Sequence, residues 1–387
     1  MQAVRLILVL ALAPAVGVGL CRFAYSLVLP DMRESLHWSY ATAGFMNTAN
    51  AAGYLTGALA ASPIAQRITL HRAVVIGTLV CVVTLVLSMS ANTVVLSVAR
   101  FLAGFAGAIA FVAASALAAN IAQAFPLRLG FLMGLLYTGP AIGIFISGLV
   151  APFLLDALGP GSWWIVWGAL AMIAVALTAV LPLARTAPEQ GTGGVAAERA
   201  AIAPMLIYLI GYFLYGIGSI AYMTFMIAFV REAGGGAQLQ SAFWTIIALG
   251  AFVSPSLWGG VIGRSRGGGG TAIVTAVTGL GAMIPFFASS PAALALSAAV
   301  FGAGFFAVTS STTAFVRFNY PPQAWAKAIG VLTMAFGIGS MLGPIIAGAV
   351  FDATGNLHTM PEFAAAMLAL GALVAAFQKP LDRASEA

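Results

Sequence analysis

The chain has 387 residues, of which 61% are hydrophobic and only 7% are charged. Soluble domains carry about 25% charged residues, so this composition excludes a soluble globular protein and indicates an integral membrane protein. A net charge of +6 could suggest a nucleic-acid partner, but the basic residues are distributed over the loops of a membrane protein, and we expect the bilayer and no nucleic acid as partner.

The hydropathy pattern breaks into about twelve apolar runs that are long enough to span a bilayer. We expect these runs near residues 4–30, 40–64, 73–91, 93–118, 128–154, 163–183, 203–230, 241–263, 271–288, 292–315, 326–351 and 361–378. The first run could be a signal peptide, but no soluble mature domain follows it, so we assign it as the first transmembrane helix. Cys21 and Cys81 both fall in predicted helices, and we expect no disulfide, no metal site and no cofactor.

The basic residues predict how the chain is oriented. With the N-terminus inside, the outer loops hold only Arg33 and Arg231 of the 16 basic residues, while Arg22 and Arg100 lie within helices. The remaining basic residues then lie on the cytoplasmic side, as the positive-inside rule requires. We therefore expect a multi-pass protein of a bacterial inner membrane with both termini in the cytoplasm.

Arg22 lies inside the first apolar run, in the stretch Gly17 to Asp31. An ionised side chain at membrane depth normally faces a wet cavity or a partner, because its burial in lipid is costly. Snorkelling to the headgroups is the alternative, but the end of the run is about 8 residues away, roughly 12 Å along a helix, which is at the limit of that reach.

The second and fourth runs also carry polar groups. Asn47, Asn50 and Tyr54 follow the helical i, i+3, i+7 spacing and share a face that must point into the protein or into water. These side chains could bind substrate or could equally form structural hydrogen bonds. Arg100 lies in the fourth run at a depth similar to that of Arg22, so the two arginines are predicted to form an anion-binding pair.

The second half of the chain repeats the first. Phe101-Leu-Ala-Gly104-Phe matches Phe301-Gly-Ala-Gly304-Phe, and Gly134, Gly143 and Asp156 match Gly330, Gly339 and Asp352 at a constant offset. The Gly, Pro and charged stretch between the halves marks a linker. We therefore predict an N-terminal six-helix bundle (1–184), a cytoplasmic linker (185–202) and a C-terminal six-helix bundle (203–387), with the substrate near the midplane between the halves. The second half has no counterpart of the two arginines and offers Tyr212, Tyr215 and Tyr222 instead.

The stretches Gly19-Leu-Cys-Arg22-Phe-Ala-Tyr25 and Asn50-Ala-Ala-Gly53-Tyr54-Leu-Thr-Gly57 carry a resemblance to a known family. Over essentially its whole length the chain resembles the major facilitator superfamily of secondary transporters, and these two stretches resemble its bacterial YbfB/YjiJ-type branch. The resemblance implies the major facilitator fold, with helices 1 and 4 lining a central cavity. It also places Arg100 at the arginine of the superfamily's helix 4 motif.

The resemblance further implies residues for gating. The helix 5 stretch from Gly134 through Tyr137, Gly139, Pro140 and Gly143 is similar to the motif associated with antiporters, although Ile144 replaces its last glycine. The inner-loop motif keeps its basic residues as Arg67 and Arg72. It departs at Gln66, where the superfamily usually has aspartate, and at Thr69, where it usually has glycine.

No Asp, Glu, His or Lys lies in the interior of a predicted helix, which argues against a cation carrier or a carboxylate proton relay. We therefore interpret the chain as a monomeric alternating-access transporter of a small organic anion. Substrate-binding candidates are Arg22, Arg100, Asn47, Asn50, Tyr54, Tyr137, Tyr215 and Tyr222, and gating candidates are Gly139, Pro140, Gly143, Arg67, Arg72 and Asp31. Coupling would use anion exchange or a proton carried by the substrate.

Two other functions stay open. One is a proton-coupled drug or metabolite exporter, for which Asp31 is the nearest titrating candidate. The other is a non-transporting membrane sensor on the same scaffold. We do not expect an enzyme, because the sequence carries no HExxH, GxSxG or His/Cys cluster.

Overall fold

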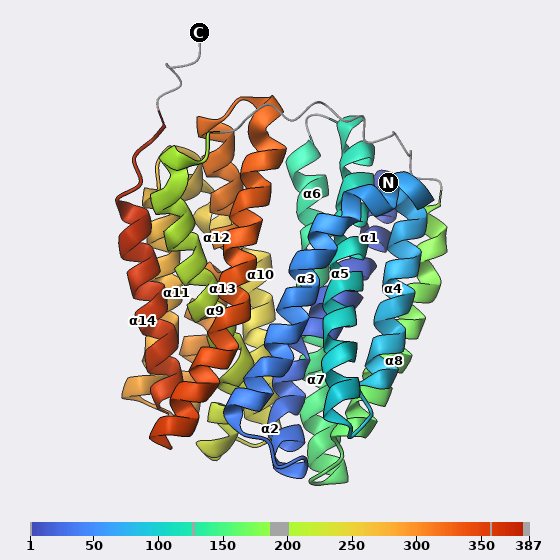
Figure 1. Ribbon diagram of the computed structural model, residues 1–387, viewed down its shortest axis with the longest axis vertical. Helices are drawn as coiled ribbons and strands as arrows, with labels where there is room; N and C mark the ends of the chain where they lie inside the picture. Colours follow the sequence, from blue (N-terminus) through green and yellow to red (C-terminus); the bar gives the residue numbers. More distant parts are fainter. Residues whose placement is uncertain (1, 126–127, 186–200, 357, 382–387) are drawn as a thin grey trace. The chain divides into compact units, whose positions relative to one another are not determined.

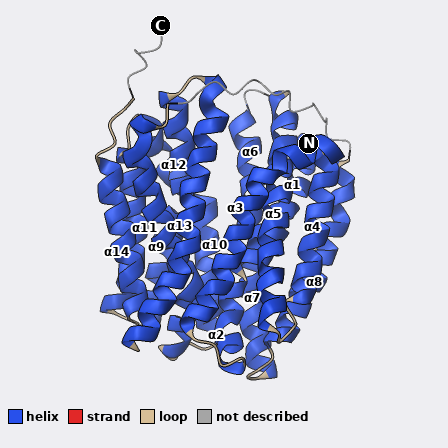
Figure 2. Ribbon diagram, in the orientation of Figure 1, coloured by secondary structure: helices blue, strands red, loops and turns tan. Residues whose placement is uncertain are grey.

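The computed structural model describes residues 2–125, 128–185, 201–356 and 358–381. The described residues form helices joined by short turns, as Figure 2 shows. Long apolar runs fold this way in a bilayer because only a helix or a closed barrel satisfies every backbone group internally.

The first helix is continuous from Gln2 to Ser35 and has three parts, α1 (Gln2–Pro14), a π-helical segment η1 (Ala15–Phe23) and α2 (Tyr25–Ser35). The chain then forms α3 (Tyr40–Ile68), α4 (Leu70–Leu87), α5 (Thr93–Gln123), α6 (Leu129–Tyr137), α7 (Gly139–Leu158), α8 (Trp163–Val180) and the short η3 (Leu181–Ala184). Helices α3, α5, α4 and α8 lie side by side in that order (Figure 1).

The second half begins with the short η4 (Ala203–Met205) and α9 (Leu206–Glu232). It continues with α10 (Ala237–Arg264), α11 (Gly269–Phe287), α12 (Pro291–Asn319), the short η5 (Pro322–Ala324), α13 (Trp325–Thr354) and α14 (Thr359–Ala376). Helix α9 packs against α13 and α14, and α11 packs against α12 and α14.

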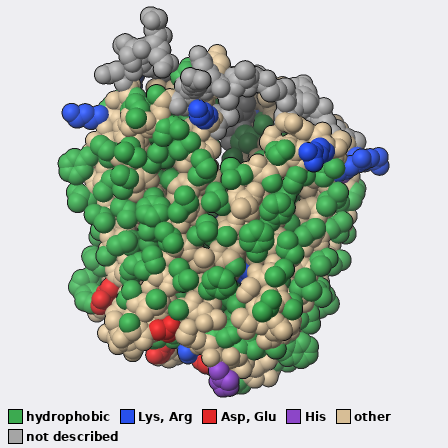
Figure 3. Space-filling view, viewed as in Figure 1, with side chains coloured by type: hydrophobic (Ala, Val, Ile, Leu, Met, Phe, Trp, Pro, Cys, Tyr) green, Lys and Arg blue, Asp and Glu red, His purple; other side chains and the backbone are tan. Residues whose placement is uncertain are grey.

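Eleven described helical segments are long and apolar enough to cross a membrane. The predicted run 40–64 is not among them; it forms α3, which has 29 residues and whose amides and hydroxyls lower its hydropathy. Hydrophobic side chains cover much of the visible face of the helices, as expected for surfaces that contact lipid (Figure 3).

The contacts divide the chain into two compact units, Met1–Gly193 with Gly235–Thr245, and Gly194–Gly234 with Ile246–Ala387. Of the predicted linker 185–202, residues 186–200 lie outside the described part of the chain. The predicted six-helix boundaries therefore remain a prediction.

Glycines allow the helices to approach closely where the functional residues lie. A Cβ atom added at Gly53 on α3 would lie 1.9 Å from the carbonyl oxygen of Phe101 on α5, and one added at Gly104 on α5 would lie 2.0 Å from the carbonyl oxygen of Asn50. Close backbone approach through small residues is the usual way that membrane helices pack. It presses the polar face of α3 against the helix that carries Arg100.

The internal repeat is visible in matching contacts within each unit. A Cβ atom at Gly143 on α7 would lie 2.2 Å from the carbonyl oxygen of Ala15, and one at Gly339 on α13 would lie 2.2 Å from that of Phe213 on α9. The other pair matched in sequence, Gly134 and Gly330, has no such neighbour within 4 Å among the described residues. The repeat therefore includes the contact between the first and fifth helices of each half.

Candidate functional site

The first helix changes to π-helical geometry at the point where the site lies. The nine-residue segment η1 contains Gly17 and Gly19, and Ala24 N–H donates to the Gly19 carbonyl at 3.2 Å, five residues back. A Cβ atom at Gly17 would lie 2.8 Å from the Cα of Gly107 on α5, and one at Gly19 would lie 2.4 Å from the Cα of Gly143 on α7. Segments of π-helix inside α-helices are frequent at functional sites. Arg22, near the C-terminal end of this π-helical segment, is therefore a candidate functional residue.

Arg100 holds the end of this π-helical segment. Its Nη1 donates to the main-chain carbonyl of Cys21, and its Nη2 donates to the main-chain carbonyl of Arg22 at 3.3 Å. Its Cζ lies 4.6 Å from the ring centroid of Tyr25 and 5.9 Å from that of Trp167. Arg100 is 2% exposed. Nη1 and Nη2 are therefore engaged by the backbone of the first helix, whereas the buried Nε has no hydrogen-bond partner among the described residues.

Arg22 has a different environment. Its side chain is 5% exposed, and its Cζ lies 5.1 Å from the ring centroid of Tyr54 and 5.8 Å from that of Phe23. Its Nε and Nη2 are buried and have no hydrogen-bond partner among the described residues. The structure thus brings the two predicted arginines together but gives them different surroundings, which sequence spacing alone does not reveal.

The polar face predicted on α3 lies beside these arginines. Asn50 is fully buried, and its Nδ2 donates to the main-chain carbonyl of Arg100 at 3.0 Å. Asn47 is buried one turn away, and Tyr54 supplies the ring nearest to Arg22. Of the two roles left open for this face, Asn50 takes the structural one through its amide nitrogen, while its buried Oδ1 has no partner among the described residues.

Sequence reasoning did not identify Tyr25 and Trp167 as part of the site. The Tyr25 hydroxyl donates to the carbonyl of Ala43 at 2.8 Å, and Trp167 Nε1 lies 3.4 Å from Sδ of Met32. Both rings face Arg100 while their polar ends are held elsewhere. An aromatic residue three positions after Arg22 was the only available signal for Tyr25, and nothing in the sequence connects Trp167 with the arginines.

Asp31 is buried and serves as a helix cap. The first helix continues beyond the predicted run to Ser35, so Asp31 lies inside it and is 3% exposed. Its Oδ1 accepts from the N–H of Gly161 and its Oδ2 from the N–H of Trp163, both at 2.9 Å. These N–H groups are at the start of α8, where a carboxylate satisfies orphan donors and complements the helix dipole.

The other three predicted tyrosines, Tyr137, Tyr215 and Tyr222, lie in separate environments. Tyr137 at the end of α6 is 54% exposed and packs edge-on against Phe111. In the second unit the Tyr215 hydroxyl donates to the carbonyl of Phe305 at 2.5 Å, and the Tyr222 hydroxyl shares a 2.5 Å hydrogen bond with Ser297. The last two hydroxyls are thus hydrogen-bonded inside their own unit.

The gating candidates on helix 5 form the contact between α7 and the first helix. A Cβ atom at Gly139 would lie 2.3 Å from the carbonyl oxygen of Ala11, and one at Gly19 would lie 2.9 Å from the carbonyl oxygen of Pro140. With Gly143, these residues allow the two helices to touch through their backbones. Any change in the π-helical segment must therefore be accommodated at this contact.

The inner-loop candidates Arg67 and Arg72 are exposed at the end of α3 and the start of α4. Between them Thr69 adopts φ +75°, a conformation that favours glycine. The Thr69 hydroxyl accepts from the N–H of Arg72 at 3.4 Å and caps α4. Gln66 Nε2 donates to Ser62 Oγ at 3.4 Å, so its amide makes a local contact within α3.

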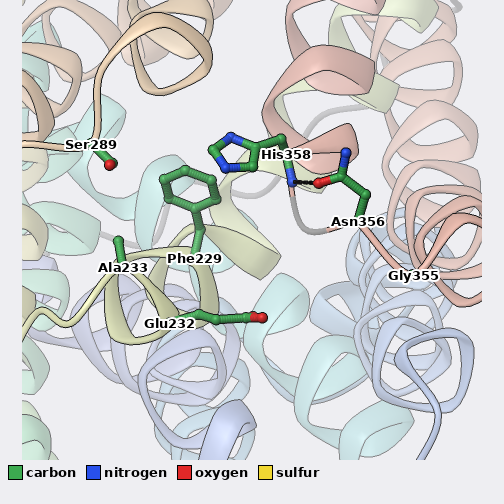
Figure 4. A pocket seen from close by; sticks show the side chains of 7 residues that line it. All are labelled: Phe229, Glu232, Ala233, Ser289, Gly355, Asn356 and His358. Atoms are coloured by element: carbon green, nitrogen blue, oxygen red, sulfur yellow. Dashed lines mark hydrogen bonds between the residues drawn. The ribbon is translucent and has the colours of Figure 1, made fainter.

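The second unit contains a separate pocket of about 340 Å³ that sequence reasoning did not find. It lies at the ends of α9 and α13 and the turn after α11, and Figure 4 shows its lining residues, Phe229, Glu232, Ala233, Ser289, Gly355, Asn356 and His358. The ring of His358 packs edge-on against Phe229 with centroids 5.3 Å apart, and the main-chain N–H of His358 donates to Asn356 Oδ1 at 3.0 Å.

Two units of long apolar helices, with glycine contacts that recur in each unit, indicate a multi-pass membrane protein built as an internal repeat. The chain belongs to the family described as the uncharacterised MFS-type transporter YbfB, whose model matches residues 14–376. A comparison with curated proteins found no match.

Solved structures show the same fold. The nucleoside transporter NupG is 17% identical with a TM-score of 0.73, covering 98% of this chain and 100% of that one. A bacterial homolog of the human lysosomal transporter Spinster is 14% identical with a TM-score of 0.71, covering 97% of this chain and 96% of that one. A variant of the E. coli fucose:proton symporter FucP is 17% identical with a TM-score of 0.63, covering 97% and 98%.

Proposed function

We propose that the protein is an alternating-access secondary transporter of a small organic anion and that Arg22 binds the anionic group. The observation that carries this proposal is the buried Arg22 guanidinium, whose Nε and Nη2 have no hydrogen-bond partner among the described residues. Placing a charged side chain at membrane depth costs about 2.5–3.5 kcal/mol of free energy on insertion scales. A buried arginine with unpartnered N–H groups therefore favours a ligand that compensates this cost.

The chemistry of the two unpaired nitrogens supports a carboxylate. Nε and Nη2 form one edge of the guanidinium, and their N–H groups point in the same direction. That edge matches the two oxygens of a carboxylate, which arginine binds in a bidentate manner. The rings of Tyr54 and Phe23 lie near the same guanidinium and provide an apolar border. A carboxylate with an apolar or aromatic body suits this combination best.

Arg100 is proposed to act through the first helix. Its hydrogen bonds to the carbonyls of Cys21 and Arg22 hold the end of the π-helical segment in place. They thereby fix the main-chain position of Arg22 and the direction of its side chain. We therefore assign ligand binding to Arg22 and positioning to Arg100. The buried Asn50 Oδ1 is a candidate acceptor for a hydroxyl or amine on the substrate.

Coupling by anion exchange, or by a proton that the substrate carries, follows because an arginine does not give up its proton in a protein. The exporter alternative needs a titrating group, and its candidate Asp31 already accepts two main-chain hydrogen bonds. The non-transporting sensor remains the second alternative. We further propose a monomer in a bacterial inner membrane with both termini in the cytoplasm, as the positive-inside rule predicts.

Matched pairs of solutes test the proposal. Purified protein in proteoliposomes should show counterflow of benzoate, phenylacetate or hexanoate, and it should not carry benzyl alcohol, phenylethanol or hexanol by the same route. The neutral partners have nearly the same apolar body, so the difference isolates the carboxylate. Saturable transport of neutral sugars or nucleosides, without transport of any anion, would contradict the proposed substrate class.

A further inference from the structure

A groove lies at the start of the first helix in the first unit, away from Arg22. Its volume is about 630 Å³, and it is lined by Val4, Leu8, Val9 and Leu12 with the two basic residues Arg5 and Arg128. Residues 4, 8 and 12 recur every fourth position and form a stripe along α1. Leu8 in this stripe is 43% exposed. The groove therefore presents an apolar floor to its surroundings.

The two arginines lie on different elements at one end of this floor. Arg5 belongs to the first turns of α1, and Arg128 precedes the first residue of α6, which packs against α1. Both side chains are exposed, and the described residues that line the groove include no acidic side chain. Two guanidiniums beside an apolar stripe complement a molecule with an anionic head and a hydrocarbon tail.

We propose that this groove binds an anionic phospholipid, whose headgroup phosphate contacts Arg5 and Arg128 and whose upper acyl chain lies along Val4, Leu8 and Leu12. The lipid is the favoured occupant because the helix that carries the groove is long and apolar enough to cross a membrane and the groove begins at the end of that helix. Basic pockets at the ends of transmembrane helices bind acidic headgroups through the same charge complementarity. The inference is independent of the substrate carried at Arg22.

Thermal unfolding and native mass spectrometry of the delipidated full-length protein test this site. Phosphatidylglycerol or cardiolipin in mixed micelles should raise the melting temperature more than phosphatidylcholine with the same acyl chains. The double variant R5Q/R128Q should lose this difference and bind phosphatidylglycerol about 30-fold more weakly, given about 1 kcal/mol for each basic residue. The double variant R264Q/R266Q, in the second unit, is the matched control and should keep the preference.

Two further variants distinguish the contribution of the lipid headgroup from that of the acyl chain, and they control for a folding defect. R5K/R128K keeps both charges and should keep selectivity for phosphatidylglycerol. Leu8→Gln changes only the floor and should weaken phosphatidylglycerol binding without altering the response to salt. The proposal is overturned if phosphatidylcholine protects as well as phosphatidylglycerol, or if R5Q/R128Q retains the preference. It is also overturned if inorganic phosphate or benzoate at equal ionic strength gives the same protection, because the groove would then be a site for soluble anions.

Discussion

The Arg100 side chain on α5 donates a hydrogen bond from Nη2 to the main-chain carbonyl of Arg22, at 3.3 Å. The two residues are 78 positions apart in the sequence, and this contact connects the π-helical segment of the first helix with the fourth predicted helix. The carbonyls at the end of that segment accept from Nη1 and Nη2 of Arg100 and leave its Nε without a partner among the described residues, whereas Arg22 has both Nε and Nη2 without one. We therefore expect mutation of Arg100 and mutation of Arg22 to have different effects.

The Arg100→Gln variant should unfold at a lower temperature even without ligand. The substitution removes two charge-assisted hydrogen bonds from the Arg100 guanidinium to buried carbonyls. Each such hydrogen bond contributes about 1.5–3 kcal/mol to stability. Thermal unfolding of the purified protein in detergent measures the effect, with the exposed Arg67→Gln as control. An unchanged melting temperature for Arg100→Gln would mean that these hydrogen bonds do not stabilise the first helix.

The Asp31→Asn variant should lose stability but retain anion counterflow. An amide offers one acceptor oxygen in place of the two that now bind Gly161 N–H and Trp163 N–H, and the loss of a cap costs about 0.5–2 kcal/mol. Thermal unfolding and counterflow on the same preparation check both parts. A variant with normal stability and normal binding that has lost proton-driven flux would favour the exporter alternative.

Alanine at two matched glycines tests the contact between helices 1 and 5. Gly143→Ala should sharply lower stability, because its Cβ would lie 2.2 Å from the carbonyl oxygen of Ala15 and the backbones would have to separate. Gly134→Ala should be neutral or stabilise the helix by up to about 1 kcal/mol, because the described residues place nothing within 4 Å of the added Cβ.

The internal repeat predicts the same contrast in the second unit. Gly339→Ala should be harmful and Gly330→Ala should be tolerated, since the Cβ contact of Gly339 with Phe213 repeats that of Gly143. Yield of folded protein and melting temperature measure both pairs. Equal behaviour of Gly339→Ala and Gly330→Ala would show that the repeated contact is not needed.

Cysteine labelling tests the orientation. Cys21 and Cys81 are free thiols but buried, so the native protein should react little with a membrane-impermeant maleimide. Glu34→Cys should label in intact cells, whereas Arg264→Cys should label only after the membrane is opened. Labelling of Arg264→Cys from outside would reverse the predicted topology.

The sequence predicted the fold well because hydropathy and small-residue spacing determine where helices run. It also predicted that Arg22 and Arg100 lie close together, from their depth in two apolar runs. It could not predict their different surroundings, because the carbonyls that bind Arg100 depend on a π-helical segment that leaves no side-chain signature. Tyr137 shows the same limit, since the spacing did not reveal that its side chain is 54% exposed.

The helix ends were less predictable for a similar reason. The first run was expected to end at Pro30, yet the helix continues to Ser35 with Pro30 inside it. That extension buries Asp31, and its partners are main-chain N–H groups about 130 residues later in the chain. No periodicity in the sequence reports such a long-range cap.

The most direct test is the affinity of Arg22 variants for the best-transported carboxylate of the counterflow panel, measured by ligand-induced thermal shift. Arg22→Gln should fold with a normal melting temperature and bind about 10- to 150-fold more weakly, since one hydrogen bond to a charged group contributes about 1.5–3 kcal/mol. Arg22→Lys should recover only part of the affinity, because a point charge cannot reproduce a bidentate fork. If Arg22→Gln folds normally and binds the carboxylate with unchanged affinity, Arg22 is not the anion site.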